Sequence, residues 1–296
     1  MNIDFVSDYY KFVCSCVNLL IKDGFKFTKP NDNNNEEVVK EYLNWITWIP
    51  TVQPRQIRYP SNFICPKKLE NGFLKLIEAI TKGENLYPWM SRRIYDKPRF
   101  VDNCQQILNI YHFHLGTVIE KQQIQGTNDL ALFYFTEDEA YFIDFCDHEI
   151  FKNVEKLNKI FNKLYETYPE LKPKLTGFPY FGTKETINLS FEDSYELEKE
   201  GISTLYRYDD NQYYFAAGSG ITSAKTSMKS TMSYIKMINF IKQQEINFKK
   251  IYEPEIRLNK NITFLPEFLP NIVIKIDGKN YLFADDKLFE LCNENR

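Results

Sequence analysis

The chain has 296 residues with a net charge of −3 at pH 7, and 43% of its residues are hydrophobic. This composition suffices for a folded protein with a sizeable core. The weak negative charge excludes a protein that coats nucleic acid through a positive field over its whole surface. The six cysteines show no paired spacing, which predicts free thiols in a reducing compartment. Because there is neither a basic leader nor a run of about 18 apolar residues, we expect a cytoplasmic protein without a membrane span.

The N-terminal region, residues 1–60, is predicted to be helical and then extended. Apolar residues recur at helical spacing over residues 4–23, and again from Glu36 to Trp48. Three prolines then favour an extended path. A third helix is predicted over residues 66–81, at the start of the central region, residues 61–152.

A loop from Tyr87 to Phe100 combines aromatic and basic side chains. Residues 82–99 carry five basic residues against two acidic ones, and Arg92 and Arg93 are among them. Arginine and aromatic side chains together can hold phosphates and stack on unpaired bases, so we predict that both arginines contact RNA. The alternative is that the aromatic residues of this loop pack against their own domain.

All three histidines lie between positions 112 and 148, in a window that predicts three strands. The first strand holds His112 and His114, and apolar runs from Leu130 to Phe135 and from Ala140 to Cys146 form the next two. Because side chains alternate along a strand, His112 and His114 point to the same face, and His148 follows the third strand directly. We therefore expect the sheet to bring the three imidazoles together.

Short motifs follow one another through this window in a fixed order. They are Lys82-Gly83, Pro88 to Arg93, Tyr95-Asp96, His112-x-His114-Leu115, Thr127-Asn128-Asp129, Phe133-Tyr134, Tyr141 to Ile143, and His148. In order and spacing, the run of residues 77–151 resembles the YafO-type mRNA interferases, which are ribosome-dependent endoribonuclease toxins of the RelE-like superfamily. The resemblance implies a RelE-like fold with a central antiparallel sheet, and cleavage of RNA.

The chemistry expected of such a site is acid and base catalysis on RNA. Cleavage without a metal needs a base for the ribose 2′-hydroxyl, an acid for the leaving 5′-oxygen, and donors that stabilise charge on the phosphate. Histidine titrates near neutral pH and can take either proton-transfer role. His112, His114 and His148 are therefore the predicted acid and base.

Supporting residues are predicted from the same window. Thr127 with Asn128 would offer hydrogen-bond donors, and Asp129 or Asp144 would orient an imidazole. Where the family pattern has an arginine before the threonine, this chain has Gly126. The cation that holds the phosphate would then come from Lys121, Arg92 or Arg93.

Two alternatives remain open for the same residues. His112, His114 and His148 could instead be the three ligands of a catalytic metal in a hydrolase or nuclease, although no Cys-x-x-Cys or His-Glu-x-x-His motif accompanies them. A non-catalytic binding module that kept the sheet and lost the arginine at position 126 is the other alternative.

The C-terminal region, residues 153–296, is predicted to be an α/β extension. Helices are expected at residues 153–168 and 191–199, and hairpins at residues 202–217 and 272–283. A long helix is expected from Thr222 to Phe248, opened by Gly218-Ser219-Gly220. Lys225 and Lys229 near its start are predicted to contact the phosphates of RNA.

The sequence thus predicts an α+β protein with N-terminal helices, a central antiparallel sheet that carries the histidines, and a C-terminal α/β extension. The predicted function is a metal-independent endoribonuclease of toxin type that needs no cofactor. RNA is the expected partner, with the ribosome and an antitoxin or inhibitor protein as further candidates.

Overall fold

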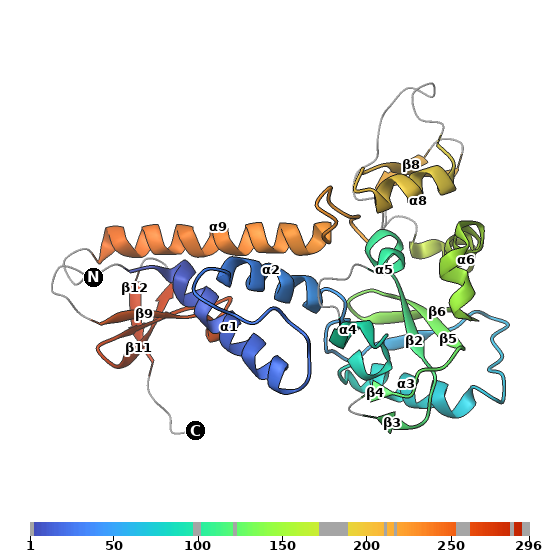
Figure 1. Cartoon of the computed structure of the whole chain (residues 1–296), viewed down its shortest axis with the longest axis horizontal. Coiled ribbons are helices and arrows are strands. Elements are labelled where there is room, and N and C mark those ends of the chain that lie inside the picture. The colour runs from blue at the N-terminus through green and yellow to red at the C-terminus, as the bar shows by residue number, and fades with distance from the viewer. Residues whose placement is uncertain are drawn as a thin grey trace. The chain divides into compact units, whose positions relative to one another are not determined.

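The structure is a computed structural model that describes residues 3–96, 102–120, 123–171, 189–209, 212–215, 218–252, 261–284 and 287–291. Helices and strands both contribute, as predicted for an α+β protein. The chain forms two compact units: one comprises Asn44–Ser230, and the other joins Met1–Leu43 to Thr231–Arg296 (Figure 1). The predicted regions were consecutive stretches of sequence, whereas the second unit combines both ends of the chain.

The larger unit, Asn44–Ser230, is built on a four-stranded sheet with the order β1-β6-β5-β2. The strands are β1 (Gln56–Arg58), β2 (Ile110–His114), β5 (Leu130–Phe135) and β6 (Glu139–Cys146). β2, β5 and β6 are antiparallel, as the sequence predicts, whereas β1 lies parallel to β6. A short hairpin of β3 (Ile119–Glu120) and β4 (Gln123–Ile124) follows β2.

Helices cover both faces of this sheet. On one face, Phe73 of α3 (Glu70–Lys82) packs against Phe133 and Phe142, with ring centroids 6.3 and 5.2 Å apart. On the other face, α6 (Val154–Thr167) buries its apolar stripe against Tyr141 and Ile143. All six residues of β5 are buried, as expected for a central strand that is covered on both sides.

Four short elements surround the end of β2. They are α4 (Arg93–Asp96), α5 (Asn103–Leu108), the 3-10 helix η2 (His148–Lys152) and α8 (Phe191–Lys199). α5 begins after Asp102, whose side chain accepts a hydrogen bond from the Gln105 amide, and ends at Asn109, which has a left-handed φ of 55°. This left-handed residue leads the chain directly into β2. Two further 3-10 helices are η1 (Tyr87–Trp89) and η3 (Pro169–Leu171).

The end of the larger unit differs from the prediction at the long helix. α9 (Met228–Ile251) begins at Met228 rather than at Thr222. Residues 221–227 form a closed turn, because Ile221 pairs with Ser227 and the Thr222 amide donates to the Thr226 carbonyl. The preceding hairpin of β7 (Leu205–Asp209) and β8 (Gln212–Phe215) lies where it was predicted.

The smaller unit contains α1 (Phe5–Lys22), most of α2 (Asn35–Ile46), most of α9 and a C-terminal sheet. The sheet is antiparallel with the order β12-β11-β10-β9, and the 3-10 helix η4 (Pro266–Phe268) follows β9. Its strands are β9 (Ile262–Leu265), β10 (Ile272–Ile276), β11 (Lys279–Ala284) and β12 (Lys287–Glu290). Phe5, Phe248 and Phe264 form its core, with ring centroids of Phe5 5.7 and 5.1 Å from the other two. Within the described segments, none of the helices combines the length and apolarity that crossing a bilayer requires.

Candidate functional site

A cavity of about 730 Å³ in the larger unit contains all three histidines. It is enclosed by the end of β2, the start of α5, η2, α8 and the residues that lead into α4. The lining side chains with polar or aromatic groups are Ser91, Arg92, Arg93, Asp102, Asn103, Cys104, His112, His114, His148, Phe151, Lys152, Tyr195, Glu196 and Lys199.

The three imidazoles come from two places in the fold. His112 and His114 alternate with Phe113 on β2 and face the cavity together, as the strand periodicity predicts. His148 opens η2, directly after β6, and its ring centroid lies 5.3 Å from that of His114. Phe151 lies beside them, with its ring centroid 4.7 Å from that of His112. The structure therefore brings the three predicted histidines into one cavity.

His112 faces a carboxylate that the sequence did not single out. Its Nδ1 lies 3.5 Å from Oδ2 of Asp102, the N-cap residue of α5. Burial lowers the pKa of His112, and the Asp102 charge acts in the opposite direction. The ring is consequently neutral at neutral pH, and a proton that it gained there would be stabilised by Asp102.

His114 is held by the backbone of Thr127. Its Nδ1 lies 3.2 Å from the Thr127 amide nitrogen, which donates to it, and 3.1 Å from the Thr127 carbonyl oxygen. The amide can donate to Nδ1 when this nitrogen carries no proton, and the carbonyl can accept from Nδ1 when it does. Thr127 therefore accommodates either protonation state of Nδ1. Burial is the main reason that the pKa of His114 falls to about 4.

The Thr127 side chain has a structural role that differs from the predicted one. Its hydroxyl donates to the Asp129 carbonyl at 2.6 Å and accepts from the Leu115 amide at 3.0 Å. The first contact lies within the loop that follows β4, and the second ties this loop to the residue directly after β2, so the hydroxyl fixes the loop instead of pointing at a phosphate. The residue still positions His114 through its backbone.

The two carboxylates predicted to orient an imidazole are bound elsewhere. Asp129 accepts from Lys68 at 2.9 Å, and Asp144 accepts from Lys163 of α6 at 2.5 Å. Neither lines the histidine cavity, where Asp102 takes that place. The expectation for Asp129 and Asp144 is therefore wrong. Each carboxylate binds a lysine outside the histidine cavity instead of orienting an imidazole. Lys121 lies outside the described residues.

Cationic side chains line the cavity. Arg92 and Arg93 are among them, and both raise the cost of charging the nearby histidines. Lys152 of η2 and Lys199 of α8, which the sequence did not single out, also line it, and they pair with Glu149 and Glu196 at 2.7 and 2.8 Å. A phosphate that enters the cavity would therefore meet the two arginines and two lysines that are each paired with a glutamate.

The two lysines predicted near the long helix do not reach the cavity. Lys225 donates to Glu200 at 2.7 Å and also to the Lys199 carbonyl. Lys229 is exposed in the first turn of α9. Neither belongs to the lining, so their predicted contact with RNA would have to be made outside the histidine cavity.

Gly126 lies at the cavity, at the position where the related pattern has an arginine. A Cβ added there would meet nothing within 4 Å, and the backbone is not left-handed. A Cβ at this position would therefore not clash with its surroundings.

Comparison of the chain with protein-family models, with curated proteins and with solved structures finds no match. Within the described segments, no group of three or more histidine, cysteine, aspartate or glutamate side chains is placed to hold a metal ion. The thiol of Cys104 is fully buried, and burial raises its pKa well above the ordinary value, which makes it a poor nucleophile.

The cavity places imidazoles that can exchange protons beside two arginine side chains. Two of its imidazoles are held neutral by burial, and one of these faces a carboxylate that would stabilise its protonated form. Arginine side chains are suited to binding phosphate oxygens because their planar donors match that geometry. Together these groups suit a reaction that moves protons at a phosphodiester.

Proposed function

We propose that the chain is an endoribonuclease of toxin type that cleaves RNA by histidine acid and base catalysis, without a metal. The observation that supports the proposal most is the meeting of His112, His114 and His148 with Asp102 and the two arginines in one cavity. The resemblance of residues 77–151 to the YafO-type interferases points to the same chemistry.

The geometry suggests a role for each imidazole. His112 is neutral and backed by Asp102, so it is the base that takes the proton of the ribose 2′-hydroxyl. The 2′-oxygen then attacks phosphorus, and the bond from phosphorus to the 5′-oxygen breaks. His148 gives a proton to that leaving oxygen. The products are a 2′,3′-cyclic phosphate and a 5′-hydroxyl.

The remaining groups hold the phosphate. His114 is kept in place by Thr127 and presents its free ring nitrogen, Nε2, to a phosphate oxygen. Arg92 and Arg93 take the part of the arginine that the related pattern has at position 126. The proposal places the protein in the cytoplasm, with ribosome-bound mRNA as its substrate and an antitoxin or inhibitor protein as its regulator.

The test is induced expression of the wild type beside His112→Ala, His114→Ala and His148→Ala, followed by measurement of growth and RNA integrity. The matched control is Lys67→Ala, which removes an exposed cation outside the cavity. The proposal expects growth arrest and RNA fragments with the wild type and the control, and neither with the histidine variants.

Purified protein separates the alternatives. Cleavage that a chelator abolishes would overturn the metal-free mechanism in favour of a metal-dependent nuclease. If the protein cleaved no RNA with or without ribosomes, a non-catalytic binding module would be favoured. If only Gly126→Arg were active, the missing arginine would be the reason that the wild type is inactive.

A further inference from the structure

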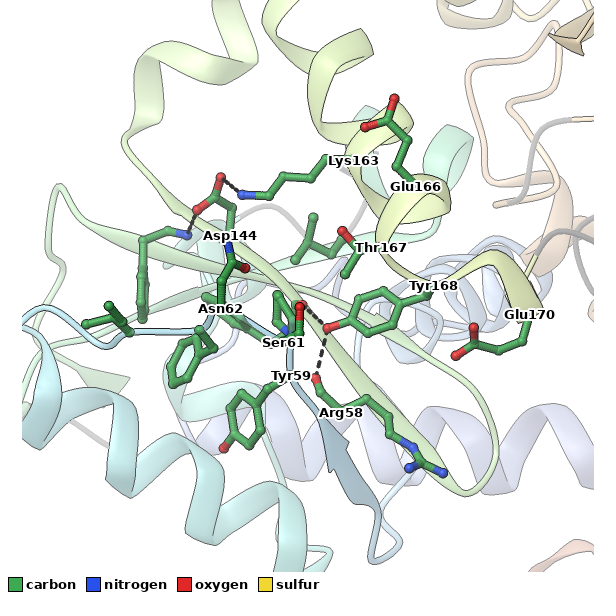
Figure 2. Close-up of a pocket in the computed structure, with 16 residues that line it drawn as sticks. Arg58, Tyr59, Ser61, Asn62, Asp144, Lys163, Glu166, Thr167, Tyr168 and Glu170 are labelled. Carbon is green, nitrogen blue, oxygen red and sulfur yellow. Dashed lines mark hydrogen bonds and ion pairs between the residues drawn. The ribbon is translucent and has the colours of Figure 1, made fainter.

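A second cavity, of about 1060 Å³, lies along the outer edge of β6 in the larger unit. β1 pairs only with Glu139 to Tyr141 of the eight-residue β6, and Pro60, which lacks an amide hydrogen, follows two residues after β1 ends. The next residues of β6, Phe142 to Phe145, line the cavity (Figure 2). This part of the edge is about 13 Å long and has no neighbouring strand on that side among the described residues.

The two walls of this cavity lie on opposite faces of the sheet. One wall is the segment after β1, where Phe63 packs against Phe142 and against Phe73 of α3, with ring centroids 5.0 and 5.6 Å apart. The other wall is the end of α6, which packs on the opposite face of the sheet, against Ile143. In Figure 2, Lys163 and Thr167 of α6 lie on one side of the cavity and Tyr59 of the loop on the other, and the Lys163 side chain extends toward Asp144.

The walls differ in chemistry. The first carries Tyr59 beside Phe63 and an Ile64 side chain that is 84% exposed, together with the polar Ser61 and Asn62. The second carries Glu166 of α6 and Glu170 of η3, which form no salt bridge among the described residues.

The cations of the cavity are already paired within the protein. Lys163 binds Asp144 at 2.5 Å, and Arg58 donates to Glu139 at 2.7 Å. The lining carries three carboxylates, Asp144, Glu166 and Glu170, against the two cations Arg58 and Lys163. An occupant with positive charge is therefore favoured over one with negative charge.

Two backbone groups on the open edge are bonded only by side chains. Tyr168 donates its hydroxyl to the Phe142 carbonyl at 2.7 Å, and the Phe145 amide donates to Oδ1 of Asp144 at 2.9 Å. The side chains of Asp144 and Lys163 are 38% and 42% exposed, so their ion pair is weak and can open. An incoming strand can then replace Asp144 as the partner of the Phe145 amide.

We propose that this cavity binds an extended basic peptide of a partner protein, which adds a strand to the open edge of β6. Such addition gains affinity from backbone hydrogen bonds and specificity from the pockets that alternate side chains enter. Because successive side chains of a strand point to opposite faces, the bound segment alternates basic residues, toward Glu166 and Glu170, with apolar residues, toward Tyr59 and Phe63.

The test is a titration of the full-length, isotope-labelled protein with the heptapeptide Lys-Val-Lys-Val-Lys-Val-Lys, capped at both ends. We expect a Kd below about 1 mM, with the largest amide shifts at residues 142–145. The peptide Lys-Lys-Lys-Lys-Val-Val-Val, which has the same composition without alternation, should bind at least about tenfold more weakly.

Charge reversal on the protein tests the acidic wall. Glu166→Lys with Glu170→Lys should weaken binding of the alternating peptide about tenfold or more. The control pair is Glu84→Lys with Glu155→Lys, which makes the same change of charge at exposed positions outside the cavity and should leave binding unchanged. If the double variant does not fold, added salt should weaken binding to the wild type instead.

The inference would be overturned if the alternating peptide did not bind, or if its binding left the amide signals of residues 142–145 unchanged. It would also be overturned if the non-alternating peptide or Glu-Val-Glu-Val-Glu-Val-Glu bound equally well. Equal loss of binding in both charge-reversed pairs would overturn it too.

Discussion

At the scale of single residues, Asp102 links the fold to the chemistry. One carboxylate oxygen, Oδ1, accepts from the Gln105 amide at 3.1 Å and caps α5, while the other, Oδ2, lies 3.5 Å from Nδ1 of His112. The cap fixes the position of the carboxylate, and the carboxylate in turn stabilises the protonated ring of His112. The two roles can be separated by mutation.

Asp102→Asn retains a good capping side chain and removes the charge. We expect the rate of RNA cleavage to fall about 10²-fold, and the acid limb of its pH profile to move to lower pH, because the charge of Asp102 raises the pKa of His112. Asp102→Ala should show the same kinetic loss and also lose about 1 kcal/mol of stability. An unchanged pH profile in Asp102→Asn would contradict this role.

The burial of His114 makes the stability of the fold depend on pH. The folded protein holds the pKa of this ring at about 4, against 6.5 for an unperturbed histidine, so between these values the unfolded chain binds the proton more readily. Its contribution is therefore present above pH 6.5 and lost as the pH falls toward 4. In His114→Gln the loss of unfolding free energy between pH 7.5 and pH 4 should be smaller by about 3 kcal/mol. Urea titrations of both proteins measure this difference, and equal losses would contradict the account.

At the scale of elements, α3 must approach the end of β2 closely. Gly72 lies in the first turn of α3, and a Cβ there would overlap the backbone carbonyl of Leu115, which directly follows β2. A backbone atom cannot yield as a flexible side chain can, so the contact requires glycine at this position.

Gly72→Ala is a sharp test of that contact. Alanine would gain at most about 1 kcal/mol from helix propensity, but overlap with a backbone atom costs about 3 kcal/mol or more, so we expect a net loss of stability of about 2 kcal/mol or more. Thermal and urea unfolding give the value. Gly126→Ala is the control, since its added Cβ meets nothing within 4 Å, and it should change stability little. A stabilised Gly72→Ala protein would show that the contact yields.

Periodicity in the sequence predicts most elements within a few residues. The helix predicted at 4–23 spans Phe5–Lys22, and the strands that carry the histidines lie where their apolar patterns indicate. The third helix begins at Glu70 rather than at residue 66, because the preceding residues form a turn closed by the Leu69 amide and the Pro66 carbonyl. β1 was not predicted as a strand, since three residues near prolines carry too short a pattern.

Only those features of the site that depend on local sequence patterns could be predicted. Strand alternation places His112 and His114 on one face, and the position of His148 after β6 brings it to them. The partner of His112 depends on how α5 meets β2, and the pairing of Asp129 with Lys68 joins residues 61 positions apart. Neither contact leaves a periodic signal in the sequence.

At the scale of the whole molecule, the two helices α6 and α8, which follow residue 152, are not separable from the sheet. α6 and α8 belong to the same compact unit as the histidines, and Leu157 and Leu164 of α6 are 1% and 0% exposed. The five buried side chains of α6 contribute on the order of 10 kcal/mol, which is comparable with the whole stability of a domain.

A chain that ends at residue 155 should therefore fail to fold, rather than lose only a regulatory part. Circular dichroism and thermal unfolding of this truncated protein would show no cooperative transition. A cooperative transition with retained RNA cleavage would mean that the sheet is stable without α6.

The measurement that tests the central claim most directly is the chemistry of the RNA ends after cleavage by the purified protein. Attack by the ribose 2′-hydroxyl with histidine as acid and base leaves a 2′,3′-cyclic phosphate on one fragment and a 5′-hydroxyl on the other. We predict these ends with the wild type, in the presence of chelator, and their loss in His112→Ala. Fragments with 5′-phosphate and 3′-hydroxyl ends that disappear with chelator would contradict the account.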